Sequence, residues 1–335
     1  MISRERIFAV MAGKEVDRRP FTAFLALYGA RLTGCPLKEY YGNEAAYSEG
    51  QAAVFEEFHP DILFSPMAIA IEGEIYGSEV RYFENQAPNL LKPAVLTVKD
   101  LENLTQPDVD SHPRLLFIRR SVQRIVSSFG REVAVAAIIL SPVDSPVMIL
   151  GLERWLDTVL FDREGTKRVL DVTIPFFIRW ANSLFADGAD MLILPSALLN
   201  PTIVTREIVE RTVLPVLKRA FSMVQVPIVI HHTGARFCSF LDLYADLPNV
   251  AGVVLDHRDD FITARGKVGD KMVLIGGIDG PSLRRSSPKA ITDHCKSILE
   301  KLRTDRRYIL ATSAADVAYD TPKECIHAVK RATEE

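Results

Sequence analysis

The chain has 335 residues, of which 48% are hydrophobic and 25% charged, with a formal net charge of −3. This balance is typical of a globular protein and gives no reason to expect nucleic acid or an anionic membrane as a partner. No apolar run approaches the roughly 20 residues that span a bilayer, and the charged start at residues 1–6 lacks the apolar segment of a signal peptide. We therefore expect a cytoplasmic protein. Its four cysteines form no Cys-x-x-Cys pair, which favours free thiols.

Hydrophobic periodicity predicts strands that alternate with helices along the whole chain. Core strands are predicted at residues 21–27, 61–66, 133–140, 191–195, from Pro227 to the His231-His232 pair, and at 250–255, 272–276 and 308–311. Helices are predicted at residues 2–13, 37–58 with an interruption at 40–43, 115–129, 149–161, 163–186 with a bend at Pro175, 208–223, 239–247, 262–268, 288–302 and 321–333. Residues 78–84 are predicted to belong to a small hairpin outside the main sheet.

Strands separated by helical sequence are typical of a parallel sheet. Eight such units, in a chain somewhat longer than the usual ~250 residues, predict a (β/α)8 TIM barrel with a small insertion after the second strand. We expect residues 1–335 to form this barrel as a single domain. An open doubly wound sheet is the alternative, but no Gly-x-Gly-x-x-Gly turn follows any of the strands.

Two adjacent imidazoles end the fifth predicted strand. The carboxyl ends of barrel strands converge on one mouth, and functional residues gather there. Successive side chains of a strand point to opposite sides, so only one of His231 and His232 would face the barrel axis unless the following turn brings both into the mouth. We interpret His231 as a catalytic candidate and His232 as a substrate-binding candidate. The alternative for either is a packed, hydrogen-bonded imidazole.

The neighbouring strands end in polar residues as well. Asp256-His257 closes the sixth strand, and a carboxylate beside an imidazole fixes its tautomer or raises its basicity, so both are catalytic candidates. Asp279 follows Gly276-Gly277, where the missing side chains leave room for a ligand or a tight turn. Gly277, Asp279 and Asn200, which lies in the loop after the fourth strand, are substrate-binding candidates. Helix capping by the aspartates and turn formation by Asn200 are the alternatives.

Several common catalytic motifs are missing from the sequence. It contains no Gly-x-Ser-x-Gly nucleophile elbow, no phosphate-binding Gly-x-x-x-x-Gly-Lys-Ser/Thr loop and no His-Glu-x-x-His zinc motif. Catalysis by a positioned acid and base, or by a bound metal, remains as the chemistry that the sequence allows.

Residues 5–20 (Glu-Arg-Ile-Phe-Ala-Val-Met-Ala-Gly-Lys-Glu-Val-Asp-Arg-Arg-Pro) resemble the N-terminal signature of the uroporphyrinogen decarboxylase superfamily. The His231 strand, the turn at residues 276–279 and Asp320-Thr321-Pro322 before the last helix follow in the order of that superfamily. The resemblance covers essentially the whole chain, and it implies a (β/α)8 barrel.

The superfamily has two main activities. True decarboxylases remove acetate carboxyl groups from a tetrapyrrole without a cofactor. A second branch moves methyl groups between a corrinoid protein and an acceptor, often a zinc-activated thiol such as coenzyme M. Residues 61–66 look like the decarboxylase motif, but Pro66 occupies the place of its catalytic aspartate. Pro66 followed by residues 72–77 is more similar to the methyltransferase branch, so porphyrinogen decarboxylation is not expected.

The zinc site of the thiol-using enzymes is poorly matched. They bind zinc with a His-x-Cys pair on the fifth strand and a cysteine shortly before Asp-Thr-Pro. Here the first place reads His231-His232-Thr233, and the second cysteine falls at or near Ala315. Because thiolates make zinc binding tight in such sites, their loss predicts that this zinc site is absent. The alternative is a metal site rebuilt from other donors, taken from His231, His232, Cys238, Asp256 and His257.

We therefore hypothesise a methyltransferase of one-carbon metabolism. It would move a methyl group between a methylcorrinoid on a partner corrinoid protein and a small molecule, tetrahydrofolate, without thiolate zinc. A nitrogen acceptor needs proton management, which His231 or His257 would supply, and Asp256 or Asp279 would accept the paired N–H donors of the pterin. Two alternatives stay open: a cofactor-free decarboxylase or lyase acting on a small acid, and a non-catalytic barrel subunit.

Overall fold

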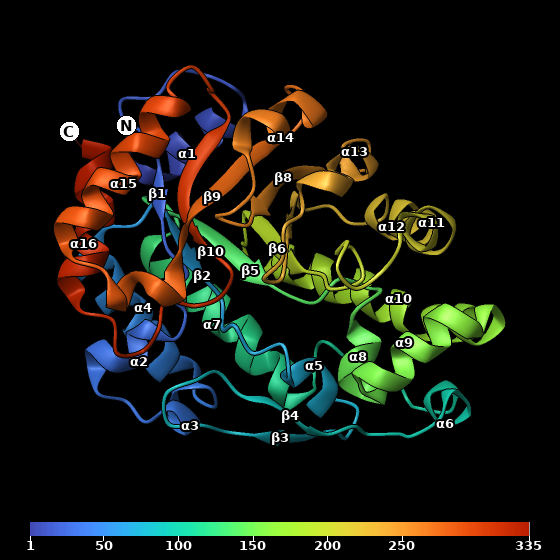
Figure 1. Ribbon diagram of the computed structural model, residues 1–335. Coiled ribbons are helices and arrows are strands. Elements are labelled where there is room, and N and C mark those ends of the chain that lie inside the picture. Colours follow the sequence, from blue (N-terminus) through green and yellow to red (C-terminus); the bar gives the residue numbers. More distant parts are fainter. Residues whose placement is uncertain (335) are drawn as a thin grey trace.

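The computed structural model describes residues 1–334, in which eight parallel strands curl into a barrel surrounded by helices (Figure 1). Around the barrel the strands follow the order β1-β10-β9-β8-β7-β6-β5-β2. The predicted (β/α)8 barrel is confirmed. Its strands are β1 (Phe21–Thr22), β2 (Ile62–Phe64), β5 (Ala134–Ile138), β6 (Met191–Pro195), β7 (Ile228–His231), β8 (Val250–Leu255), β9 (Val273–Asp279) and β10 (Tyr308–Ser313).

Helices connect these strands and cover the outside of the barrel. The α-helices are α1 (Ser3–Met11), α2 (Tyr28–Thr33), α3 (Leu37–Tyr40), α4 (Glu44–Phe58), α5 (Ile71–Glu74), α6 (Val98–Glu102), α7 (Pro113–Phe129), α8 (Ser145–Leu150), α9 (Leu152–Phe161), α10 (Arg163–Ala186), α11 (Arg206–Ile208), α12 (Leu214–Phe221), α13 (Leu241–Tyr244), α14 (Phe261–Val268), α15 (Pro288–Lys301) and α16 (Lys323–Glu334). A π-helical stretch, η1 (Val209–Val213), joins α11 to α12, and η2 (Cys238–Phe240) and η3 (Gly280–Arg285) are 3-10 helices. Among residues 1–334, no helix is long and apolar enough to cross a bilayer.

Alternate residues of the strands face the inside of the barrel and form a core of their own, separate from the one between strands and helices. Ile7 and Val10 of α1 pack into the inner core, and Phe64 at the carboxyl end of β2 stacks on Phe24 with ring centroids 4.6 Å apart. The other inward-facing strand residues are Ile62, Ala134, Ala136, Ile138, Met191, Ile193, Val229, Val254, Val273, Ile275, Ile309 and Ala311.

The barrel closes between β1 and β2 through Asp61, which precedes β2. The Asp61 N–H donates to the carbonyl of Phe21 (2.8 Å), and its carboxylate accepts the Phe21 N–H (2.8 Å). The same carboxylate is fully buried and pairs with Arg6 (2.6 Å) and Arg18 (2.8 Å). Both arginines belong to the N-terminal signature, so that segment fastens the closure of the barrel.

The predicted insertion after the second strand is present. It contains α5, the strands β3 (Glu79–Arg81) and β4 (Asn89–Lys92), and α6. β3 and β4 pair antiparallel in a two-stranded sheet apart from the barrel, which confirms the predicted hairpin (Figure 1).

The first barrel strand is shorter than predicted, because residues 23–27 leave the sheet. The Phe24 N–H donates to Thr312 Oγ1 (2.8 Å), and Gln51 Nε2 donates to the carbonyls of Leu25 (3.4 Å) and Ala26 (3.5 Å). The apolar pattern predicts that residues 23–27 continue the strand. Instead, their backbone groups form hydrogen bonds with side chains rather than with a neighbouring strand.

Other element boundaries also differ from the prediction. β9 and β10 extend beyond their predicted ends, since they stay in register up to the Asp279–Ser313 pair. The helix predicted at 149–161 is broken at Gly151 (φ 89°) into α8 and α9. The helix predicted at 239–247 is reduced to the short η2 and α13.

Candidate active site

Strand alternation places four polar side chains at the carboxyl end of the barrel interior. His231 follows the inward-facing Val229 on β7, and Asp256 follows Val254 at the end of β8. The other two, Asp279 of β9 and Ser313 of β10, are partners in register. His231 and Asp256 are buried, whereas Asp279 is half-buried at the mouth.

His231 presents one free nitrogen. Its Nδ1 accepts the N–H of Thr233 (3.1 Å), so the neutral ring carries its hydrogen on Nε2. Burial, helped by the neighbouring His232, lowers the pKa of His231 to about 3, and the ring is therefore neutral at pH 7. Among residues 1–334, Nε2 has no hydrogen-bond partner, which leaves this N–H available to a bound molecule. The ring also meets Phe24 edge-on, with centroids 5.5 Å apart.

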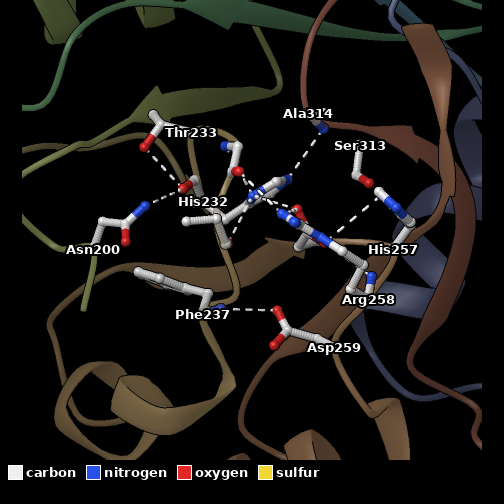
Figure 2. A network of polar contacts seen from close by, with 12 residues as sticks. Asn200, His232, Thr233, Phe237, His257, Arg258, Asp259, Ser313 and Ala314 are labelled. Atoms are coloured by element: carbon white, nitrogen blue, oxygen red, sulfur yellow. Dashed lines mark hydrogen bonds and ion pairs between the residues drawn. The ribbon is translucent and has the colours of Figure 1, made fainter. Parts of the chain in front are cut away.

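His232 is held by backbone groups at both ring nitrogens (Figure 2). Its Nε2 accepts the N–H of Ala314 (3.1 Å), so the neutral ring carries its hydrogen on Nδ1, 3.1 Å from the carbonyl of Ala235. The N–H of Gly234 also lies 3.0 Å from Nδ1, but it cannot donate to a nitrogen that already bears a hydrogen. Burial lowers the pKa of His232 to about 4, although the nearby Asp256 opposes this shift. This ring ties together the loops after β7 and β10.

Asp256 is an ionised carboxylate fixed by Arg258. The guanidinium binds both carboxylate oxygens (Nε–Oδ1 2.6 Å, Nη2–Oδ2 2.8 Å), and the Arg258 N–H donates to Oδ1 (2.9 Å). Burial would raise the pKa of Asp256, but these hydrogen bonds outweigh it and lower the pKa to about 2. Oδ2 lies 3.7 Å from Nδ1 of His232. Arg258 was not a predicted site residue, although its position two residues after Asp256 was a usable signal.

His257 is the most accessible imidazole of the network, with 31% of its side chain exposed. Its Nδ1 is buried, lies 3.6 Å from Oδ1 of Asp256 and has no hydrogen-bond partner within residues 1–334. Of the three imidazoles, His257 is the one that a molecule bound at the mouth reaches most easily.

The remaining predicted residues lie around this network. Asn200 is buried and donates from Nδ2 to the carbonyl of His232 (3.1 Å), while its Oδ1 accepts from Thr202. Asp279 lies near enough to Arg258 to help Asp256 raise the pKa of that guanidinium. At Gly277 (φ 103°) an added Cβ would lie 2.9 Å from the Tyr308 hydroxyl, so the space beside it is taken by the protein. Substrate binding by these residues stays a prediction.

Three further carboxyl groups near the mouth were missed in the sequence. Glu72 of α5 is buried and accepts the N–H of Leu140 (2.7 Å); burial raises its pKa to about 8. Asp144 accepts from Ser196 Oγ and from two N–H groups of the loop after β6, and burial raises its pKa to about 6. Burial likewise raises the pKa of Asp316, in the loop after β10, to about 7. From the sequence alone, an isolated acidic residue in a loop is expected to be exposed to solvent. The burial of these three carboxyl groups therefore becomes visible only in the tertiary structure.

A cavity of about 560 Å³ opens at the same end of the barrel. One wall is the loop after β10, from Ala315 to Asp320, and another is the tip of the β3–β4 hairpin, residues 85–89. Met67 lines it and also packs on the inner core. Because Ala314 donates to His232, the β10 loop borders both the cavity and the imidazole network.

The donors at the mouth do not fit the thiolate zinc site that the resemblance implies. Thr233 and Ala314 or Ala315 stand where thiolates are required, and the direct hydrogen bond from Ala314 to His232 joins the two loops. No group of three or more His, Cys, Asp or Glu side chains in the described part of the chain is arranged to hold a metal ion. In the rebuilt alternative, His232 and Asp256 would first have to give up the partners described above.

Comparison with known proteins adds independent information. A family model described as "Uroporphyrinogen decarboxylase (URO-D)" matches residues 2–335. Two curated relatives, both named "Methylcobamide:CoM methyltransferase MtbA", come from Methanosarcina acetivorans and Methanosarcina mazei. Each is 24% identical over 313 residues, which cover 89% of this chain and 88% of the relative.

Two solved structures share the fold. A "methyltransferase from Methanosarcina mazei" superposes with a TM-score of 0.88 at 19% identity, covering 100% of this chain and 98% of the other. A B12-independent methionine synthase from Shewanella sp. W3-18-1 superposes with a TM-score of 0.62 at 10% identity, covering 87% and 86%. At these identities the likeness is evidence for the barrel alone.

Proposed function

The chain belongs to the uroporphyrinogen decarboxylase family, and from that premise we propose that this methyltransferase moves a methyl group between the corrinoid of a partner protein and a nitrogen acceptor, tetrahydrofolate. The names of the curated relatives support a methylcorrinoid as one substrate. The acceptor is argued from the site of this chain itself.

The hydrogen bond from Ala314 to His232 is the observation on which we base the choice of acceptor. It brings together the two loops from which thiolate ligands would come, and Thr233 and Ala314 or Ala315 stand at the positions where those thiolates are required. A thiol acceptor gains its reactivity from a metal that makes it a thiolate. An amine keeps a lone pair once it is deprotonated or neutral, so it needs only a group that removes a proton. The site has such groups.

The electron balance of the reaction fixes what the residues must do. Towards the acceptor, the nitrogen lone pair forms the N–CH3 bond while the carbon–cobalt bond breaks. The bonding pair stays with the corrinoid, and the nitrogen loses one proton. We assign the removal of that proton to His257, which is the most exposed of the three imidazoles and whose Nδ1 lies 3.6 Å from Oδ1 of Asp256. His231 stays neutral and donates its free Nε2–H to the bound acceptor. In the reverse direction the same groups return the proton.

Methyl transfer can be assayed directly. Purified, chelator-washed protein is mixed anaerobically with methylcobalamin and either tetrahydrofolate or coenzyme M, and the loss of the methyl–cobalt absorbance is followed. We expect turnover with tetrahydrofolate and a methylated folate in the mass spectrum. Turnover only with coenzyme M would contradict the nitrogen acceptor, and consumption of a small acid without any corrinoid would favour the lyase alternative.

Metal analysis of the same preparation tests the absence of thiolate zinc. We expect no stoichiometric zinc in the wild type or in His231→Ala. Near-stoichiometric zinc that disappears in His231→Ala would reveal a rebuilt site and restore a thiol acceptor.

A further inference from the structure

The cavity beside the imidazole network contains an unmatched carboxyl group. Asp316 lines it, and its Oδ1 accepts the N–H of Leu27 at the long distance of 3.3 Å. In the described residues no cation lies within ion-pair distance of Asp316. The nearest lining cation, Arg284, is already bound by both oxygens of Asp320 (2.8 and 2.9 Å). Asp316 is partly buried and has no cation partner among the described residues, so its carboxyl group is available to a ligand in the cavity.

The rest of the lining indicates the chemistry of that ligand. Leu27, Met67 and Ile69 offer apolar surface, and Asn85 and Gln86 at the hairpin tip offer amides that both donate and accept hydrogen bonds. The volume of about 560 Å³ suits a small molecule, since such sites enclose roughly 300–1,000 Å³. A largely apolar pocket with one carboxyl group that lacks a cation partner at its wall fits a planar nitrogen heterocycle that carries adjacent N–H donors.

We propose that this cavity binds the methyl acceptor, with Asp316 accepting the paired N–H donors of its heterocyclic edge and the hairpin tip at residues 85–89 covering it. The inference rests on the proposed function. It assigns the acceptor edge to Asp316 in place of Asp256, because Arg258 already binds both oxygens of Asp256.

The surroundings of Asp316 agree with this role. Burial raises the pKa of Asp316 to about 7 even though backbone N–H groups of Leu27 and Ala26 lower it, so N–H donors from a ligand would stabilise its ionised form. The chain at residues 25–27 is braced from behind, where Gln51 and Tyr40 donate to the carbonyl of Ala26. The segment whose Leu27 N–H donates to Asp316 is therefore itself held by hydrogen bonds.

Binding calorimetry with tetrahydrofolate, under anaerobic conditions, tests the proposal separately from catalysis. We expect Asp316→Asn to weaken binding about tenfold or more, because a hydrogen-bonded charge is replaced by a neutral amide. Asp246→Asn, an exposed aspartate that pairs with Lys271 and does not line the cavity, is the matched control and should bind within about twofold of the wild type. Ala87→Trp, which fills the cavity from the hairpin tip, should abolish binding while Asp316 is intact.

The outcomes separate the two ideas. Unchanged binding by both Asp316→Asn and Ala87→Trp, with melting curves like the wild type, would overturn the inference whatever the enzyme catalyses. Methylation of tetrahydrofolate with those variants fully active would overturn it as well, yet leave the proposed function intact. Conversely, Asp316-dependent binding without any methyl transfer would support the cavity and reject the reaction.

Discussion

His231 and His232 differ in which of their nitrogens are engaged. His231 faces the inner core, and its Nε2–H has no partner among the described residues. Both ring nitrogens of His232, in contrast, form hydrogen bonds with the backbone of two loops. A shift of one residue along β7 would exchange these surroundings, because the side-chain period of a strand is two. The free donor and the structural imidazole thus follow from the register of a single strand.

Asp256→Asn tests the charge at the centre of the network. The variant leaves the Arg258 guanidinium without its anion and removes the negative charge beside His257. We expect methyl transfer to fall about 100-fold, in the range typical of lost acid–base support. The measurement is the methylcobalamin assay described above. Asp260→Asn, which removes an exposed cap of α14, is the control; an equal loss of rate in both variants would mean that Asp256 acts only through folding.

The buried imidazoles also make stability depend on pH. The folded pKa of His231 is about 3, below its ordinary value of 6.5, so the unfolded chain binds a proton that the folded chain does not. The contribution of His231 to the free energy of unfolding is therefore fully present above pH 6.5 and is lost as the pH falls towards 3. Relative to wild type, His231→Gln should therefore gain about 1.4 kcal/mol in unfolding free energy for each pH unit below 6.5. Urea unfolding at pH 7, 6 and 5 checks this, and parallel curves would contradict it.

At the scale of elements, the insertion after β2 brings an acidic residue to a place where it is uncharged. α5 packs against α8, and Glu72 reaches from it to the N–H of Leu140 just beyond β5. The insertion is therefore attached to the barrel rim through a protonated carboxyl group at neutral pH. The same element leads into the hairpin whose tip borders the cavity.

The stability that Glu72→Gln gains over the wild type should depend on pH in the direction opposite to that of the histidine variant. The folded pKa of Glu72 is about 8, above its ordinary value of 4.5, so its contribution is present below pH 4.5 and is lost as the pH rises to 8. Glutamine cannot ionise and still accepts the Leu140 N–H. We expect the variant to match the wild type near pH 4.5 and to be more stable by a few kcal/mol at pH 8. Urea titrations at both values decide it; a less stable variant at pH 8 would show that Glu72 is ionised in the fold.

At the scale of the whole molecule, the closure of the barrel depends on one buried carboxylate. Asp61→Asn leaves Arg6 and Arg18 facing an uncharged group, and Arg6 is itself almost fully buried. Removing one partner of a buried ion pair costs roughly 3–5 kcal/mol. Asp17→Asn weakens the more exposed pair of Arg6 and should cost only about 0–1 kcal/mol. Unfolding free energies of the two variants compare the sites directly, and similar losses would contradict the special position of Asp61.

Local patterns were enough to predict the barrel and the gathering of polar strand ends at its mouth. The apolar runs of β5, β6 and β8 are fixed by their own residues, and polar residues at the strand ends of a parallel barrel meet by geometry. The end of β1 and the carboxyl group of Asp316 were not predictable in this way. Each depends on partners far away in the chain, Thr312 for Phe24 and Leu27 for Asp316, and a single sequence does not reveal such pairings.

The pairing of β1 with β10 has a consequence for the growing chain. Phe21 lies opposite Leu310, so the first strand is synthesised roughly 290 residues before its ladder partner. At roughly 5–20 residues per second, the ribosome needs roughly 15–60 s to supply that partner. During this interval the backbone groups of β1 that pair with β10 have no strand partner on that side. The nascent barrel is therefore open along the β1 edge until translation is almost finished. This edge is the part of the sheet that stays accessible to chaperones for the longest time.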